Sequence, residues 1–424
     1  MLSAISEVLP QKLSLARGRP YAQSLPGILW AFAAMKWSEA LAEETARTIL
    51  SQKELKPKNL AATVWSMARL TLQFPLSLPI GAVQHFGPQE LSNTGWALAT
   101  LAIDNHTALL CAMERRLWTL LEVSKPQELA STIWAFAILQ HKPEALLVAM
   151  AQTLLSTKVG HLEARHLSST AWAFATLVLL DGPLMSRVAT ASVELDLGPQ
   201  GISNMLWSFA TLQLLHFPVM RAMTRLALEQ LTQFGSQELS NLVWACGTLI
   251  YVEISLLAAI QTLAVELPLR PLELSNTVWA FATLQHGDPG PFARMVMHQL
   301  QGLPPEGLAV CAWALVELRC HDGTVLNAIA EAANEQVSAF AQEEFRMLLW
   351  ALPQDALDAA VSLLEHAEAN ERHLTAQCLS SLIAEAEQRQ LSQLEAALLQ
   401  RLGGPLCSPS STLVAAGKHL AKAS

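Results

Sequence analysis

The sequence lacks the motifs on which enzymes and metal sites are usually built. It contains no Gly-rich phosphate loop, no Ser-centred elbow, no His-Glu-x-x-His motif and no catalytic carboxylate pair. Its six cysteines include no Cys-x-x-Cys pair, and two of them, Cys246 and Cys311, fall at apolar positions. We therefore expect a protein that is not an enzyme, with no catalytic residue, no cofactor, no metal site and no disulfide framework. The thiols are expected to be buried and reduced, as in an intracellular protein.

Charged residues and long apolar runs are also scarce. Charged residues make up 15% of the chain and hydrophobic residues 52%, a composition that excludes a disordered chain. Uncharged runs such as 167–180 and 239–252 are each 14 residues long, whereas a membrane-spanning helix needs about 20. The sequence thus predicts a folded protein without membrane insertion.

The few charges are unevenly distributed. Residues 331–400 carry twelve acidic and three basic side chains, which accounts for the whole formal net charge of -9. The rest of the chain is neutral, so it lacks the basic footprint of a tight nucleic-acid binder. Residues 1–20 hold three basic residues and one acidic residue, a balance compatible with an organellar transit peptide or with a partial repeat.

What the sequence does contain is a tandem repeat marked by tryptophan. The repeat tryptophans follow one another at intervals of 31 to 38 residues, and they are Trp30, Trp65, Trp96, Trp134, Trp172, Trp207, Trp244, Trp279, Trp313 and Trp350. A period of this size is typical of a solenoid, in which no unit can bury its apolar face alone. We predict an all-α fold: one α-solenoid of about ten to eleven tandem helix-pair repeats of roughly 35–38 residues.

Each repeat predicts two antiparallel helices. The first, helix A, begins in six repeats at a Pro eight residues before the Trp, where the missing N–H is tolerated. It runs to a Leu five residues after the Trp, and a turn follows in which histidine recurs, expected as a turn residue rather than a metal ligand. An amphipathic helix B comes next, for example over 144–155. Residues 71–87 contain Pro75 and Pro79 and leave little room for a helix B.

The repeat also defines the domain organisation. We assign residues 1–20 to an N-terminal segment and 21–355 to the helical-repeat array. After Trp350 the pattern fades, so we assign 356–402 to degenerate acidic capping helices and 403–424 to a flexible tail. Terminal repeats with a polar outer face are needed to close a stack of this kind.

Most of the surface of helix A is apolar, so we expect the repeat tryptophans in the core, with small residues beside them that allow close helix packing. One stripe is polar. Positions seven before, three before and four after the Trp lie within about 40° of each other around the helix. We call these three positions, in all repeats, the polar column. Its candidate ligand-binding residues are Gln89, Asn93, Thr100, Gln127, Ser131, Ser169, Thr176, Gln200, Asn204, Thr211, Gln237, Asn241, Thr248, Asn276, Thr283 and Arg69.

Two interpretations of the polar column stay open, besides simple exposure to solvent. Its amides and hydroxyls could form an internal ladder of hydrogen bonds between neighbouring helices, which would satisfy buried polar groups. Alternatively, they line a groove and recognise RNA bases, one base per repeat. The basic residues inside the repeats are the candidates for phosphate contacts, and they are Arg69, Arg115, Arg116, Arg221, Arg225 and Arg294.

The repeat resembles a known family. Residues 87–101, GPQELSNTGWALATL, combine Pro-Gln, Leu-Ser-Asn and Trp-Ala-Leu-Ala at the observed period. They are similar to the octotricopeptide (OPR) repeats of algal organelle proteins, and to those of the FAST-kinase-like, RAP-domain and RNA-editing substrate-binding complex proteins. Versions with Asn-Thr-x-Trp-Ala-Phe-Ala-Thr, as at 276–283, resemble those abundant in dinoflagellates. OPR repeats often carry Arg four residues after the Trp, the position of Arg69.

The resemblance implies an RNA-binding helical-repeat protein that acts in organellar RNA stability, processing or translation. Its implied partner is single-stranded organellar RNA, together with proteins of a ribonucleoprotein complex, in a mitochondrion or chloroplast; otherwise we expect a soluble intracellular protein. The neutral array and the acidic C-terminal stretch favour a different class, a protein–protein interaction scaffold of the same fold without direct RNA contact.

Overall fold

The computed structural model describes residues 25–36, 39–50, 55–72, 80–101, 107–156, 163–193, 195–320, 322–336 and 339–351. These residues form helices and turns, and no β-strand occurs among them. The chain divides into two compact units, Met1–Asp196 and Leu197–Ser424, and we describe each by itself. The expected N-terminal segment, capping helices and tail lie outside the described residues.

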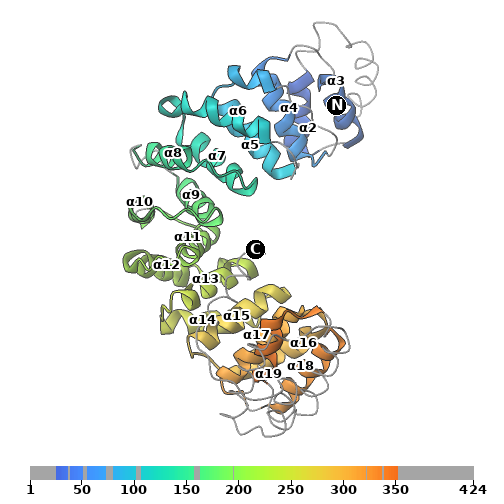
Figure 1. The fold of residues 1–424 in the computed structure, drawn as a ribbon, viewed down its shortest axis with the longest axis vertical. Helices are drawn as coiled ribbons and strands as arrows, with labels where there is room; N and C mark the ends of the chain where they lie inside the picture. Colours follow the sequence, from blue (N-terminus) through green and yellow to red (C-terminus); the bar gives the residue numbers. More distant parts are fainter. Residues whose placement is uncertain are drawn as a thin grey trace, which may run out of the picture. The chain divides into compact units, whose positions relative to one another are not determined.

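Each unit is built from a row of A helices and a set of B helices packed on them (Figure 1). The A helices of the first unit are α2 (Leu25–Met35), α4 (Pro57–Arg69), α5 (Pro88–Leu101), α7 (Pro126–Ile138) and α9 (Ala164–Thr176). Its B helices are α3 (Glu39–Leu50), α6 (Thr107–Trp118), α8 (Glu144–Ser156) and α10 (Gly182–Val193).

The second unit repeats this arrangement. Its A helices are α11 (Pro199–Thr211), α13 (Ser236–Thr248), α15 (Pro271–Thr283), α17 (Pro305–Glu317) and α19 (Gln342–Ala351). Its B helices are α12 (Phe217–Glu229), α14 (Ile254–Ala264), α16 (Pro289–Gln299) and α18 (Gly323–Glu335). In both units each A helix packs against the next, and each B helix packs on the A helix of its own repeat. The predicted α-solenoid of helix pairs is confirmed.

The repeat of Trp65 has no described helix B. In its place the structure has a short 3-10 helix, η2 (Ile80–His85), which packs against α4 and α6. Pro75 and Pro79, from which the sequence predicts this gap, lie outside the described residues. Within the part of the chain that the structure describes, no helix is long and apolar enough to cross a membrane.

The first turn of helix A is closed by a side chain that reaches back. In α5, α7, α15 and α19 the Glu at the third helical position accepts a hydrogen bond from the backbone N–H that precedes the helix, at 2.7–3.1 Å. This bond satisfies one of the donors that every helix start leaves unpaired. In α9 the ring of His166 takes the same role, accepting from the Glu163 N–H at 3.3 Å. Burial lowers the pKa of His166, which favours the neutral, accepting ring.

The end of helix A has one fixed geometry. Each described residue six positions after the repeat Trp has a positive φ of 48–60°, and none of these is glycine: Lys36, Thr71, Gln140, Val178, Gln213, Ile250, Gln285 and Arg319. The following N–H then bonds back to a carbonyl five residues earlier, as from Tyr251 to Cys246 at 2.9 Å. This is a Schellman turn. Val178 and Ile250 are β-branched residues, for which this backbone conformation is especially unfavourable.

The end of helix B is tied to the start of its own repeat. The Gln230 side chain donates to the Leu197 carbonyl at 3.1 Å, and Gln299 donates to the Leu269 carbonyl at 2.9 Å. Gln336 and Arg116 make the equivalent bonds to Leu303 and Phe86. In each case the carbonyl lies two residues before helix A. We call this bond the clasp, because it closes the helix pair into a unit.

Small residues allow neighbouring A helices to approach closely. Gly247 of α13 faces Ala280 of α15, and a Cβ added at Gly247 would lie 3.0 Å from both the Cα and the Cβ of Ala280 and 3.1 Å from the Trp279 ring. These are the positions one and three after the Trp. The predicted role of small residues beside the rings is therefore seen in atomic detail at this contact.

The expectation that the repeat tryptophans are buried is wrong for most of them. Trp207 and Trp244 are 7% and 4% exposed, but Trp30 is 52% exposed and the other seven are half-buried. The reason is their position on helix A, next to the one side that no other helix covers. Phenylalanine fills the core instead, because Phe136, Phe209 and Phe281, two residues after the Trp, are almost fully buried.

The cysteines at apolar repeat positions behave as predicted. Cys246 and Cys311 are buried on α13 and α17, and burial raises the pKa of each thiol to about 12. Both thiols therefore stay protonated and unreactive at neutral pH. Cys111 and Cys320 are half-buried, and none of these four forms a disulfide. Cys378 and Cys407 lie outside the described residues.

Gly247→Ala should destabilise the protein by about 1–3 kcal/mol, because the new methyl group would push apart the backbones of α13 and α15. Urea denaturation followed by circular dichroism would measure the loss. Gly27→Ala in α2 is the control, since no atom lies within 4 Å of its added Cβ and Ala favours a helix. Equal stability changes in the two variants would contradict the close approach.

Ile250→Gly should stabilise the protein by about 0.5–1 kcal/mol, because glycine removes the steric cost of a positive φ and loses only part of that gain to chain entropy. The neighbouring Val252 is also exposed and lacks a positive φ, so Val252→Gly serves as the control and should lower stability. A lower melting temperature for Ile250→Gly than for the parent would show that the turn is not strained.

Candidate functional site

The polar column lies on the side of helix A that neither its neighbours nor helix B cover. At its outermost position Gln89, Gln127, Gln200 and Gln237 are all exposed. At the position three before the Trp the side chains are half-buried: Asn93, Ser131, Ser169, Asn204 and Asn241. Three residues at this position are buried, Asn276, Val310 and Met347, with 7%, 2% and 8% exposure. Because consecutive A helices are packed together, each unit aligns its own column residues into one stripe.

The column does not form the internal ladder. Among the described residues, no hydrogen bond joins an amide or hydroxyl of the column to a neighbouring A helix. A side-chain bond between A helices does occur just outside the column, where the Ser240 hydroxyl of α13 donates to the Glu273 carbonyl of α15 at 3.2 Å. Ser240 lies four residues before its Trp and is buried. The amides of the column therefore keep their hydrogen-bonding capacity for other partners.

The threonines four residues after the Trp fall into two groups. Thr100 is exposed, and its hydroxyl donates to the Trp96 carbonyl at 2.8 Å. In the second group the hydroxyl oxygen is buried and has no hydrogen-bond partner, and its members are Thr176, Thr211, Thr248 and Thr283. The Oδ1 atom of Asn276 is also buried without a partner. An unpaired buried polar atom costs free energy. Because these oxygens are buried, a ligand does not reach them in this structure, in contrast to the exposed Thr100.

Tryptophan rings border the column. The rings of Trp65 and Trp96 lie 6.1 Å apart between centroids in the first unit, and those of Trp207 and Trp244 lie 6.5 Å apart in the second. The Arg69 guanidinium lies over the Trp65 ring at 5.7 Å, close enough for a cation–π contact. Trp65 and Trp96 are half-buried and leave part of an aromatic surface accessible beside the column of the first unit, whereas Trp207 and Trp244 are buried.

Charged residues also occupy column positions, and sequence reasoning missed most of them. Lys58 and Arg165 stand seven residues before Trp65 and Trp172, where other repeats have Gln, and both are exposed. In the second unit Glu306, Glu317 and Glu343 take column positions of α17 and α19. The spacing of these residues from the repeat Trp identifies them in the sequence. The prediction did not include them because it was restricted to the recurring residue types Gln, Asn, Ser and Thr.

The other candidate phosphate contacts lie on B helices. Arg115 and Arg116 belong to α6, Arg221 and Arg225 to α12, and Arg294 to α16. Arg116 forms a clasp, and Arg225 pairs with Glu229 at 3.8 Å. Of the basic residues proposed from the sequence, only Arg69 stands at a column position. The sequence prediction did not consider on which helix each arginine lies, so it combined residues of the polar column with residues of the B helices.

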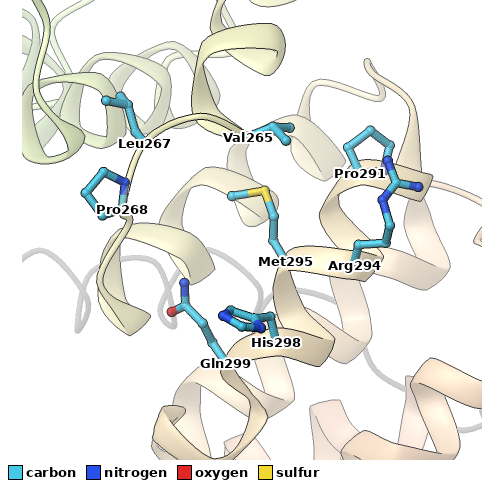
Figure 2. Close-up of a pocket in the computed structure, with 8 residues that line it drawn as sticks. All are labelled: Val265, Leu267, Pro268, Pro291, Arg294, Met295, His298 and Gln299. Atoms are coloured by element: carbon cyan, nitrogen blue, oxygen red, sulfur yellow. The ribbon is translucent and has the colours of Figure 1, made fainter.

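Arg294 instead borders a pocket of about 290 Å³ between the end of α14 and α16. Figure 2 shows Met295 in the middle of this pocket, with Pro268 and Pro291 on either side and His298 beside Gln299. The pocket is shallow and mostly apolar. It is formed by B-helix and loop residues and contains no residue of the polar column.

The recurring histidines serve the turns where the structure describes them. The His216 ring caps α12 by accepting from the Val219 N–H at 3.4 Å. His141 packs edge-on against Phe136 with 5.0 Å between centroids, and its Nε2 lies 3.3 Å from a Glu114 oxygen. Within the described ranges, His, Cys, Asp and Glu side chains form no cluster that could hold a metal ion. His106 and His321 lie outside those ranges.

Single replacements of Asn93, Asn204 or Asn241 by Ala should change the free energy of unfolding by no more than about 0.5 kcal/mol, because no intramolecular partner is lost. Ser240→Ala is the matched control and should cost about 1 kcal/mol, since it breaks a buried bond between helices. If chemical denaturation instead showed losses of about 1–3 kcal/mol for the asparagine variants, the column would have to be a buried ladder of hydrogen bonds.

Comparison with known proteins does not assign a function to this geometry. No protein-family model matches the sequence, and no curated protein matches it significantly. What the polar column does must therefore be inferred from its own residues and from the repeats that carry them.

Proposed function

We propose that the protein binds single-stranded RNA along its polar column. The observation that carries this proposal is the recurrence of Gln, Asn and Thr at the three column positions of α5, α11 and α13, where no described hydrogen bond joins them to a neighbouring A helix. Amide and hydroxyl groups both donate and accept hydrogen bonds, so they suit the varied edges of unpaired bases. A complete set of this kind in the repeats of Trp96, Trp207 and Trp244 matches recognition of one base by each of these repeats.

The bordering tryptophans support the same ligand. Half-buried rings such as Trp65 and Trp96 expose part of an aromatic surface beside the amides. Bases stack on such surfaces regardless of sequence, whereas hydrogen bonds to their edges discriminate among them. A protein ligand would have less use for a regular alternation of rings and amides. We therefore propose that the rings stack on the bases and that the column forms hydrogen bonds with the base edges.

The resemblance to OPR repeats supports a cellular role for this binding. By that resemblance we propose that the RNA is organellar, in a mitochondrion or chloroplast, and that binding affects its stability, processing or translation. We propose no catalytic step. Other proteins of a ribonucleoprotein complex would then act on the bound RNA.

A second candidate function, a protein–protein scaffold, is favoured by one observation. In two successive repeats, the turn after helix A and the first residue of helix B expose five large apolar side chains at 45–73%: Leu215, Phe217, Ile250, Val252 and Ile254. Exposed apolar groups that gather on one edge often mark a protein interface. This edge belongs to turns and does not include the column, so the two functions are compatible in one complex.

Replacing Asn93, Asn204, Asn241 and Asn276 together by Ala should weaken RNA binding or change base preference, because four base-recognition positions are lost. Binding would be measured by filter retention of a random single-stranded RNA pool and by sequencing the retained molecules. Asn327→Ala is the control, since Asn327 is an exposed amide on helix B. Unchanged affinity and unchanged base preference in the folded quadruple variant would rule out the column as the RNA site.

A further inference from the structure

The charges of the polar column differ between the two units. In the first unit Lys58 and Arg69 stand on α4 and Arg165 stands on α9, while the column residues of α5 and α7 between them are uncharged. In the second unit the column residues of α11, α13 and α15 are uncharged, and those of α17 and α19 include three glutamates. No basic residue occupies a described column position of the second unit. Only the first unit can therefore neutralise phosphates from this stripe.

The two cations on α4 form a pair on one face. Lys58 and Arg69 are eleven residues apart, which brings them to within about 20° of each other around the helix. Both are exposed, and among the described residues neither makes an ion pair. The Trp65 ring under Arg69 restricts the guanidinium to the side of the helix where the column lies. An unneutralised pair of this kind attracts an anion that runs along the column.

Arg165 has an acidic neighbour, but a weak one. Its Nε atom lies 2.7 Å from a Glu163 oxygen, and the two side chains are 65% and 57% exposed. An ion pair so open to water contributes little to stability. A phosphate can therefore displace Glu163 without a large penalty. The three cations stand at both ends of a stretch of four A helices, with the amide- and hydroxyl-bearing repeats of Trp96 and Trp134 between them.

The carboxylates of the second unit have the opposite effect. Glu306 and Glu317 are eleven residues apart on α17, so they lie on one face as Lys58 and Arg69 do. Glu343 follows at the equivalent position of α19, where it also pairs with Arg346 at 3.1 Å. The described column positions of these two helices therefore carry carboxylates and no basic side chain.

We propose that the RNA is held by its phosphates on the first unit, through Lys58, Arg69 and Arg165. The inference rests on the proposed RNA function and adds to it the position of the phosphate contacts. The uncharged column residues of α5 and α7, between these cations, then contribute recognition of bases without neutralising the backbone. Salt dependence should accordingly come from the first unit alone.

The test compares three triple or double variants of the full chain on one probe, a random pool of single-stranded RNA about 20 nucleotides long. For single strands each neutralised phosphate contributes about 0.7 to the slope of log affinity against log salt. K58Q/R69Q/R165Q should therefore lower the slope by about 2. R221Q/R225Q/R294Q removes the same charge from B helices and should leave it unchanged. E306Q/E317Q changes charge on the second unit and should leave the slope unchanged.

The outcomes separate this inference from the proposed function. If the parent protein binds no RNA, the proposed function fails and the inference fails with it. If the parent binds RNA but the slope falls with R221Q/R225Q/R294Q and not with the column variant, the function stands and the inference is wrong. The inference is also wrong if the parent binds RNA with an affinity that does not depend on salt. R165Q alone, expected to lower the slope by about 0.7, keeps the test valid should the triple variant fold poorly.

Discussion

The close approach of neighbouring A helices is the constraint on which the rest of the structure depends. Within a unit, each interior A helix contacts an A helix on either side and, except in the repeat of Trp65, its own helix B, so three of its four sides must be apolar. Contacts such as Gly247 against Ala280 leave no room for larger residues beside the rings. The fourth side cannot be covered by the repeat itself. Polar residues collect there, and the candidate site is a consequence of how the helices pack.

The limits of helix A could be predicted because local chemistry fixes both ends. Pro57, Pro126 and Pro271 each start a helix at the expected residue, and the predicted Leu at the far end, such as Leu284, proves to be its cap. Helix B was predicted equally well at 144–155, since its apolar periodicity is strong. The orientation of the polar column also followed from geometry, because three positions on one helix face keep their relation in every repeat.

Other features depend on neighbours that a sequence does not show. The half-exposure of the tryptophans arises because the ring borders the open side, and hydrophobicity alone had suggested the core. The turn at Ile250 is imposed by the packing of the helix pair, against the preference of a β-branched residue. Lys58 and Arg165 are identified as site residues by their position seven residues before the repeat Trp, and not by their residue type. For the same reason Arg221 and Arg294 were grouped with Arg69, although they lie on B helices.

The clasp has a consequence for how such an array can change in evolution. The bonds from Gln230 to Leu197 and from Gln299 to Leu269 each close within one repeat, as do the glutamate at the start of helix A and the turn at its end. The junction between repeats is crossed mainly by apolar contacts. A gene duplication that inserts one whole repeat would therefore strand few polar groups. It would also lengthen the column by one set of three positions, so ligand length can change while the fold is kept.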